Sequence, residues 1–137
     1  MEVVVDALRD DVAFSWVLVH LGLRGNPRAA DDPPSDTTVR AAFAALAVLV
    51  ERGLGSVGRL ELIDDGRRGR RAPTRHVAEP AIRVQKRVLD ACRVSGRAGR
   101  AWEWSCWYVN SSDGDTAARH ALEGKESAGY YLRRAVT

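Results

Sequence analysis

The chain has 137 residues, of which 45% are hydrophobic and 28% charged, and this balance is typical of one globular domain and excludes a disordered chain. Its formal net charge is +3, and its longest apolar stretches, residues 12–23 and 41–50, are shorter than the roughly 18–20 residues that span a bilayer. The acidic start, with Glu2 and Asp6, is unlike the basic start of a signal peptide. We therefore expect a cytoplasmic protein that does not enter a membrane.

The positive charge is concentrated in the middle of the chain. Residues 1–58 hold five arginines and eight acids, a net charge of −3, whereas residues 59–100 hold twelve basic and five acidic residues, a net charge of +7. Residues 101–137 have a net charge of −1. Such a basic block predicts a surface for phosphate or for an acidic protein. The alternative is that the arginines reflect GC-rich coding and are simply solvated.

The first predicted element is a helix over residues 3–21, with a break near Asp10 and Asp11, either of which would cap a helix running onward. Its apolar stripe consists of Leu8, Val12, Trp16 and Val19. Glycines and prolines over residues 22–36 predict a loop.

A second helix is expected from Asp36 or Thr37 to about Arg52, with Gly53 as its stop. Its main apolar stripe consists of Val39, Phe43, Leu46 and Val50, and the opposite side offers Ala41, Ala44, Ala45 and Val48. A helix that is apolar all round is usually buried on both sides. We therefore expect the N-terminal segment or a second subunit to cover it, and predict a homodimer through the N-terminal helices.

The middle of the chain predicts a hairpin followed by a third helix. Residues 57–63 and 74–78 have the pattern of strands, and Asp65-Gly66 is a turn signal. Pro80 suits the first turn of a helix that runs to about Val94. Its predicted apolar face consists of Ala81, Val84, Val88, Ala91 and Cys92.

The C-terminal part predicts one strand and one helix. Residues 95–101 have the composition of a flexible joint, and alternation over residues 102–109 predicts a strand. A helix is expected over residues 116–123, capped within Asp113–Asp115 and ended by Gly124. The predicted fold class is α+β, with a core over residues 1–94 and an appended strand and helix over residues 102–137 that pack on it.

The segments Leu49–Leu54 and Val57–Leu60 resemble the end of the recognition helix and the start of the wing in the MarR and PadR groups of winged-helix regulators. In these groups a glycine ends the helix, a leucine packs into the core, and a hairpin with a basic tip contacts DNA. The resemblance covers about residues 37–80. It implies a winged-helix-like core whose two-stranded basic wing has its tip at residues 65–75.

This resemblance implies a small non-enzymatic regulator of transcription that binds double-stranded DNA. Arginine favours phosphate because its planar guanidinium donates two parallel hydrogen bonds. The predicted DNA-binding residues are Thr37, Thr38, Arg40, Arg59, Arg67, Arg68, Arg70, Arg71 and Arg75. Since the second helix offers few polar side chains to read base edges, the alternative is a non-catalytic adaptor that binds an acidic protein surface.

The remaining motifs do not predict a catalytic site, a cofactor site or a metal site. Gly53, Gly55 and Gly58 match G-x-G-x-x-G, but after a helix and before a strand, the reverse of a dinucleotide site. The three histidines, His20, His76 and His120, lack metal-ligand spacing, and we expect Cys92 and Cys106 to be reduced core residues. Two alternatives stay open: His120 as a base beside Cys106, and Trp102, Trp104 and Trp107 as a base-stacking platform instead of core or interface.

Overall fold

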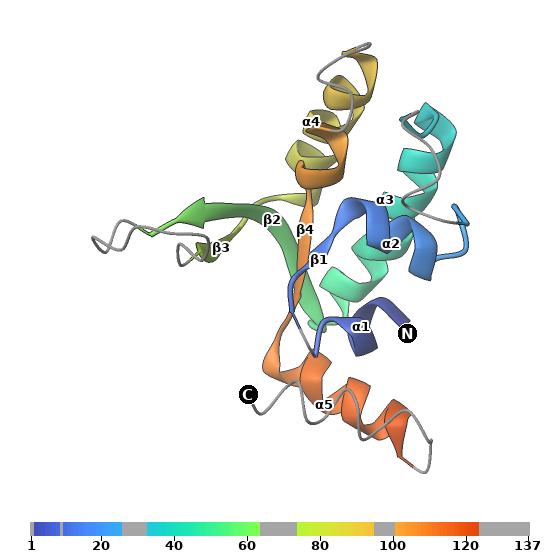
Figure 1. Ribbon diagram of the computed structural model, residues 1–137. Coiled ribbons are helices and arrows are strands. Elements are labelled where there is room, and N and C mark those ends of the chain that lie inside the picture. Colours follow the sequence, from blue (N-terminus) through green and yellow to red (C-terminus); the bar gives the residue numbers. More distant parts are fainter. Residues whose placement is uncertain (1, 9, 26–32, 64–73, 95–100, 124–137) are drawn as a thin grey trace.

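The computed structural model describes residues 2–8, 10–25, 33–63, 74–94 and 101–123. Helices and an antiparallel sheet share this part of the chain, so the fold class is α+β (Figure 1). In chain order the elements are α1 Glu2–Asp6, β1 Val12–Ala13, α2 Phe14–His20, α3 Asp36–Glu51, β2 Gly55–Leu62, β3 Thr74–Ala78, α4 Ala81–Arg93, the 3-10 helix η1 Ala101–Trp104, β4 Trp107–Asn110 and α5 Ser112–Leu122.

The sheet has the strand order β1-β4-β2-β3, with every neighbouring pair antiparallel. Tyr108 of β4 lies opposite Val12 on one side and Val57 on the other. The first half of β2 pairs with β4, and the second half pairs with β3 from Gly58↔Ala78 to Leu62↔Thr74. The outer half of the β2–β3 hairpin therefore leaves the body of the sheet and extends away from the helices (Figure 1).

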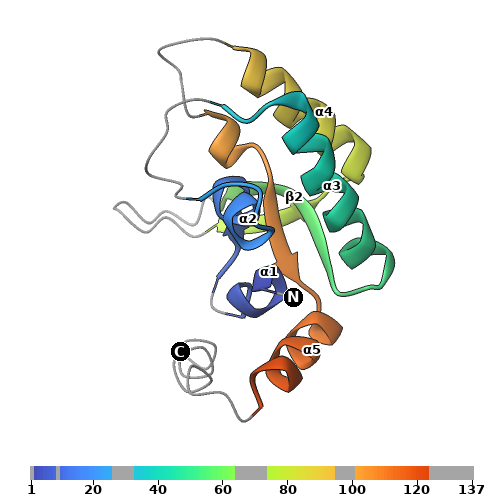
Figure 2. The ribbon, with the colours of Figure 1, turned by 90° about the vertical axis from the view of Figure 1, so that its right-hand side faces the viewer.

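The hydrophobic core lies between the sheet and the group of α2, α3, α4 and η1, and side chains of α1 and α5 extend it (Figures 1 and 2). The ring of Phe14 stacks on Phe43 at a centroid distance of 5.6 Å and meets Trp102 edge-on at 6.4 Å. Helices α1 and α5 pack against each other at the opposite end of the sheet from α4. Three segments far apart in the sequence thus meet at these rings.

In the predicted helix over residues 3–21, the break near Asp10 and Asp11 is confirmed, but the predicted cap and the buried side predicted after the break are wrong. The break near Asp10 contains strand β1, and the N-cap of α2 is Ala13, which gives no side-chain capping bond. The extended residues of β1 reset the helical phase, so the stripe does not continue from Leu8 to Trp16. Trp16 is 45% exposed. The buried side of α2 is formed by Phe14, Ser15, Val17 and Leu18.

Helix α3 matches the predicted second helix and its stop at Gly53, and differs only in its N-cap. Its N-cap is Ser35, whose side chain accepts a hydrogen bond from the backbone N–H of Thr38 at 3.2 Å. It ends before Gly53, which has a φ of +72°, a conformation that glycine adopts without strain. Val39, Phe43 and Leu46 are buried as predicted. The opposite side is not covered within the described chain: Ala41, Ala44 and Val48 are exposed.

The predicted hairpin strands and third helix are confirmed. Strand β3 has the predicted bounds, and α4 follows its N-cap Pro80. Val84 and Val88 are buried, together with Leu89, which the predicted stripe omitted. The predicted turn at residues 65–66 lies outside the described residues.

The predicted strand over residues 102–109 is wrong in its first half, where the chain forms η1. Burial of Trp102 against Phe14 turns the chain, and Ser105 closes the turn by donating from its hydroxyl to the Trp102 carbonyl at 2.7 Å. Strand β4 then lies inside the sheet, between β1 and β2. Helix α5 starts earlier than predicted, because Ser111 and not an aspartate is its N-cap. Of the predicted joint at residues 95–101, only Ala101 is described.

Candidate nucleic-acid interface

The β2–β3 hairpin carries alternating charges along one face. Arg59 and Glu61 lie on the same face of β2 because their positions differ by two. Arg75 of β3 is directly opposite Glu61 in the register. The Glu61 carboxylate accepts from Arg59 Nη2 at 2.6 Å and from Arg75 Nη2 at 3.0 Å. One carboxylate therefore joins both strands of the hairpin.

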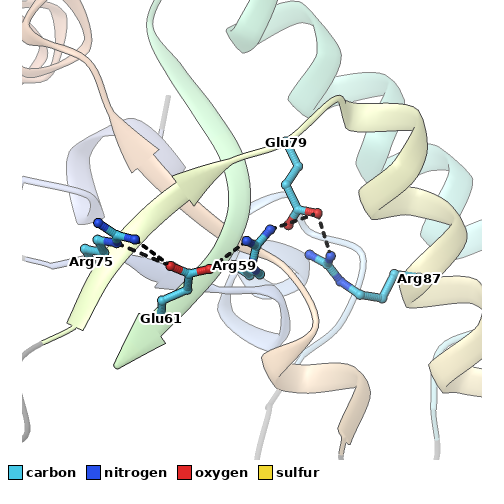
Figure 3. A network of polar contacts seen from close by, with 5 residues as sticks. All are labelled: Arg59, Glu61, Arg75, Glu79 and Arg87. Carbon is cyan, nitrogen blue, oxygen red and sulfur yellow. Dashed lines mark hydrogen bonds and ion pairs between the residues drawn. The ribbon is translucent and has the colours of Figure 1, made fainter. Parts of the chain in front are cut away.

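The same line of charges continues to the body of the protein through Glu79, whose side chain is only 7% exposed. Its Oε2 lies 3.5 Å from Arg59 Nη1 and accepts from Arg87 Nη1 of α4 at 2.9 Å. Arg87 also donates from Nε to the Ser105 carbonyl at 2.9 Å. Figure 3 shows the five side chains, which we call the charge ladder: Arg75, Glu61, Arg59, Glu79 and Arg87. The ladder ties the hairpin to α4 and to the segment before β4.

The ladder keeps its carboxylates ionised. Hydrogen bonds from Arg59 and then Arg75 hold the pKa of Glu61 below its ordinary value. The hydrogen bond from Arg87 does most to lower the pKa of Glu79, despite the opposing effect of burial. With three arginines and two glutamates, the ladder has little net positive charge. Most of the positive excess of residues 59–100 therefore belongs to other residues.

The structure brings together some of the predicted DNA-binding residues and not others. Arg59 and Arg75 share the ladder, with side chains 47% and 68% exposed. Thr37, Thr38 and Arg40 lie at the start of α3, where Asp36 pairs with Arg93 at the end of α4. Figure 1 shows this end of α3 and the outer end of the hairpin on opposite sides of the molecule. The predicted residues Arg67, Arg68, Arg70 and Arg71 lie outside the described residues.

Sequence reasoning missed the acidic half of the ladder and Arg87. The signal was present in the alternation Arg59-x-Glu61, which places opposite charges on one face of a strand. The role of Glu79 and Arg87 depends on how α4 turns back over the sheet, which no local pattern specifies. Arg59 and Arg75 thus have a structural role in the ladder, and their contact with DNA stays a prediction.

A second site, which the sequence analysis did not predict, is a groove of about 460 Å³ where the α1–β1 link, α2 and the η1–β4 segment meet. We call it the acidic–aromatic groove, since its walls include Asp6, Asp10, Asp11, Trp16, Trp104 and Trp107. Trp102, which we grouped with the other two tryptophans, is instead buried in the core. The three tryptophans, predicted as core or interface with a base-stacking platform as the alternative, therefore divide between core and surface.

The cysteine and histidine side chains form no nucleophile–base pair at Cys106. Burial raises the pKa of the Cys106 thiol to about 12, so it stays protonated at neutral pH. His120 is exposed on α5 and lies 3.1 Å from Glu123. His20 Nε2 lies 3.0 Å from Asp6 Oδ2, and His76 Nε2 lies 3.0 Å from the Trp107 carbonyl oxygen. Both cysteines are free thiols.

The described residues form neither a metal-binding cluster nor a membrane-spanning helix. They contain no group of three or more His, Cys, Asp or Glu side chains that could hold a metal ion. No helix among them is long and apolar enough to cross a membrane. Comparisons with protein-family models, curated protein sequences and solved structures found no match. The geometry and charge of this chain are therefore what indicate its function.

Proposed function

We propose that the protein binds nucleic-acid phosphates through its β2–β3 hairpin, as a small non-enzymatic regulator that contacts double-stranded DNA. One observation carries the proposal. The hairpin extends from the body of the sheet (Figure 1), and the sequence between its strands contains Arg67, Arg68, Arg70 and Arg71. Such a segment offers guanidinium groups to a phosphate backbone.

The charge ladder supports the proposal because it holds the hairpin in place, while other arginines remain for phosphate. Arg59 and Arg75 are engaged by carboxylates, so their main effect is to hold the two strands in register and to fix the hairpin on α4. A supported hairpin loses less conformational entropy when its arginines meet phosphate. The arginines of residues 67–71 supply the phosphate contacts in this proposal, and the ladder supplies the support.

The order of α3, β2 and β3 accords with a winged-helix-like core, which we include in the proposal. In this arrangement the wing contacts mainly the phosphate backbone of DNA, and α3 makes few contacts with base edges. The exposed side of α3 offers mainly alanine and valine, and its polar candidates Thr37, Thr38 and Arg40 are confined to the first turns. Binding would therefore depend more on phosphate charge than on base sequence.

The test replaces Arg67, Arg68, Arg70 and Arg71 together with alanine and measures binding to a short random-sequence duplex by fluorescence anisotropy. The matched control removes the same charge from four exposed residues elsewhere, namely Arg52, Arg83, Lys86 and Arg119. We expect the first variant to lose binding at about 200 mM salt and the control to retain most of it. Equal losses in the two variants, or no binding by the parent protein, would contradict the proposal.

A second candidate function, a non-catalytic protein-interaction module, is favoured by the exposed side of α3. Ala41, Ala44 and Val48 form an apolar strip there, and Val48 is 42% exposed. A second copy of the chain is the occupant that we propose, because a two-fold dimer buries the same strip on both subunits. Phe14, Val17 and Leu18 of α2 are buried in the core and are not available to this interface.

A further inference from the structure

The acidic–aromatic groove combines exposed tryptophan rings with several carboxylates. Trp104 and Trp107 stack at a centroid distance of 5.7 Å, with 24° between their planes, although Trp104 is 58% exposed. The indole N–H of Trp107 donates to the Trp104 carbonyl at 3.2 Å, and this bond fixes the Trp107 ring relative to the end of η1. Trp16 on α2, also exposed, lines the same groove. Exposed aromatic surface of this kind marks an interaction site.

The carboxylates of the groove are held in place by neighbouring groups. Asp10 Oδ1 accepts from the backbone N–H of Asp11 at 2.8 Å, and Asp6 Oδ2 lies 3.0 Å from His20 Nε2. Burial raises the pKa of Asp11, and the nearby Asp10 charge adds to this effect, while His76 opposes it. A bound cation would relieve both the burial cost and the repulsion.

The charge of the groove selects among ligand classes. A nucleic-acid base could stack on the tryptophans, but its phosphates would then lie near three carboxylates. A simple metal ion is disfavoured because the carboxylates do not converge as a ligand group within the described chain. An organic cation satisfies both walls, since indole faces attract cations and carboxylates neutralise them.

We propose that the acidic–aromatic groove binds arginine side chains of a basic peptide segment in a partner protein. A guanidinium can stack flat on an indole face and at the same time donate two hydrogen bonds to a carboxylate. A quaternary ammonium has no donor for the carboxylates. Asp6 already contacts His20, but Asp10 and Asp11 can each accept from one guanidinium, and the volume of about 460 Å³ has room for more than one such group. The groove therefore fits a peptide with two or more arginines.

This inference is independent of the proposed phosphate contact, which uses residues of opposite charge. The experiment measures binding of the peptide acetyl-Gly-Arg-Gly-Arg-Gly-amide by calorimetry, with the glutamine-substituted peptide as its control. The protein variants are Trp104→Ala and the pair Asp10→Asn with Asp11→Asn. The matched charge control is Glu51→Gln with Asp113→Asn, at two exposed carboxylates outside the groove. Circular dichroism and urea denaturation check that each variant is folded.

We expect Trp104→Ala to weaken peptide binding about three- to tenfold, as for loss of one cation–π contact. The paired aspartate variant should lose more, about tenfold or beyond, because each charge-assisted hydrogen bond is stronger than a neutral one. Asp10→Asn keeps the oxygen that accepts from Asp11, so the local turn should survive. The charge control should bind like the parent protein.

Several results would overturn this proposal. One is equal weakening in the charge control, which would mean that only overall charge matters. Another is peptide binding that does not change in Trp104→Ala. A third is that free arginine or tetramethylammonium binds as tightly as the peptide, which would assign the groove to small cations. A fourth is binding of a single-stranded oligonucleotide that depends on Trp104, which would make the tryptophans a base-stacking platform.

Discussion

Phe43 lies where the helical layer meets the rest of the core, buried and stacked on Phe14. Replacing Phe43 or Leu46 with alanine should lower the free energy of unfolding by about 2–5 kcal/mol, because each change leaves a cavity. Ile82→Ala, at an exposed position of α4, is the control and should change it by less than about 0.5 kcal/mol. Urea denaturation measures all three. A Phe43→Ala protein as stable as Ile82→Ala would mean that this core is wrongly described.

Cys106 gives a pH dependence whose sign follows from its burial. Its pKa is about 12 in the folded protein and near 9.0 when exposed, so the folded state holds the proton more tightly. Stability is unaffected below pH 9.0 and falls as the pH rises towards 12, by at most about 1.4 kcal/mol per pH unit. Tyr108, whose pKa burial also raises to about 12, adds to the decline. Denaturation of Cys106→Ala should show a shallower decline, and an unchanged slope would contradict the assignment.

Single residues show where sequence patterns are sufficient and where they fail. Val39, Phe43 and Leu46 are predicted correctly because one uninterrupted helix keeps them in phase. Trp16 is predicted on the wrong side because two extended residues break that phase before α2. The stacking of Trp104 on Trp107 was not predictable, because it requires the chain to turn through η1 after Trp102 enters the core.

At the level of elements, the hairpin depends on the nearly buried carboxylate of Glu79. Glu79→Gln should destabilise the protein by about 1–3 kcal/mol, since Arg59 and Arg87 would lose a charged acceptor. Hydrogen exchange of the β3 amides should rise with it. Glu61→Gln, at a more exposed position, should have a smaller effect on stability. If Glu61→Gln proved the more harmful of the two, the ladder would not anchor the hairpin as described.

The same carboxylate gives a second pH dependence. Because the pKa of Glu79 is lowered in the folded protein, its contribution is present above its ordinary pKa near 4.5 and is lost as the pH falls through the lower, folded value. The parent protein should therefore lose stability in acid more steeply than Glu79→Gln. Denaturation curves on either side of pH 4.5 provide the measurement, and parallel curves would exclude this contribution.

The apolar strip on the exposed side of α3 is the surface through which we predict a homodimer. Val48→Asp or Ala44→Asp should split the dimer into folded monomers, because a charge on the apolar strip would be buried without a partner. Sedimentation of the untagged protein at micromolar concentration measures the assembly, and Ile82→Asp at an exposed position of α4 is the matched control. A parent protein that sediments as a monomer would show that the strip is ordinary exposed surface.

Elements with local signals were predictable, and their pairing was not. Pro80 and the strand pattern at residues 74–78 place β3 and α4 almost to the residue. The position of β4 between β1 and β2 depends on contacts between segments far apart in the chain, such as Ala13 with Trp107. An alternating pattern indicates a strand but does not identify its neighbours.

For the molecule as a whole, charge is divided between two surfaces of opposite sign. Acids from residues 6–11 line the acidic–aromatic groove, whereas the basic excess belongs to residues 59–100. The sequence shows this imbalance, but the fold is needed to place the acids beside exposed tryptophans. The two proposals therefore require ligands of opposite charge, and variants in one site should leave the other intact.

The most direct test of the proposed function is the salt dependence of DNA binding. Each phosphate contact adds about 0.9 to the slope of log affinity against log salt concentration. Replacing Arg67, Arg68, Arg70 and Arg71 with alanine should therefore lower this slope by about 3–4 between roughly 50 and 200 mM salt. A variant with the parent's slope, or a parent protein whose binding does not respond to salt, would contradict phosphate binding by the hairpin.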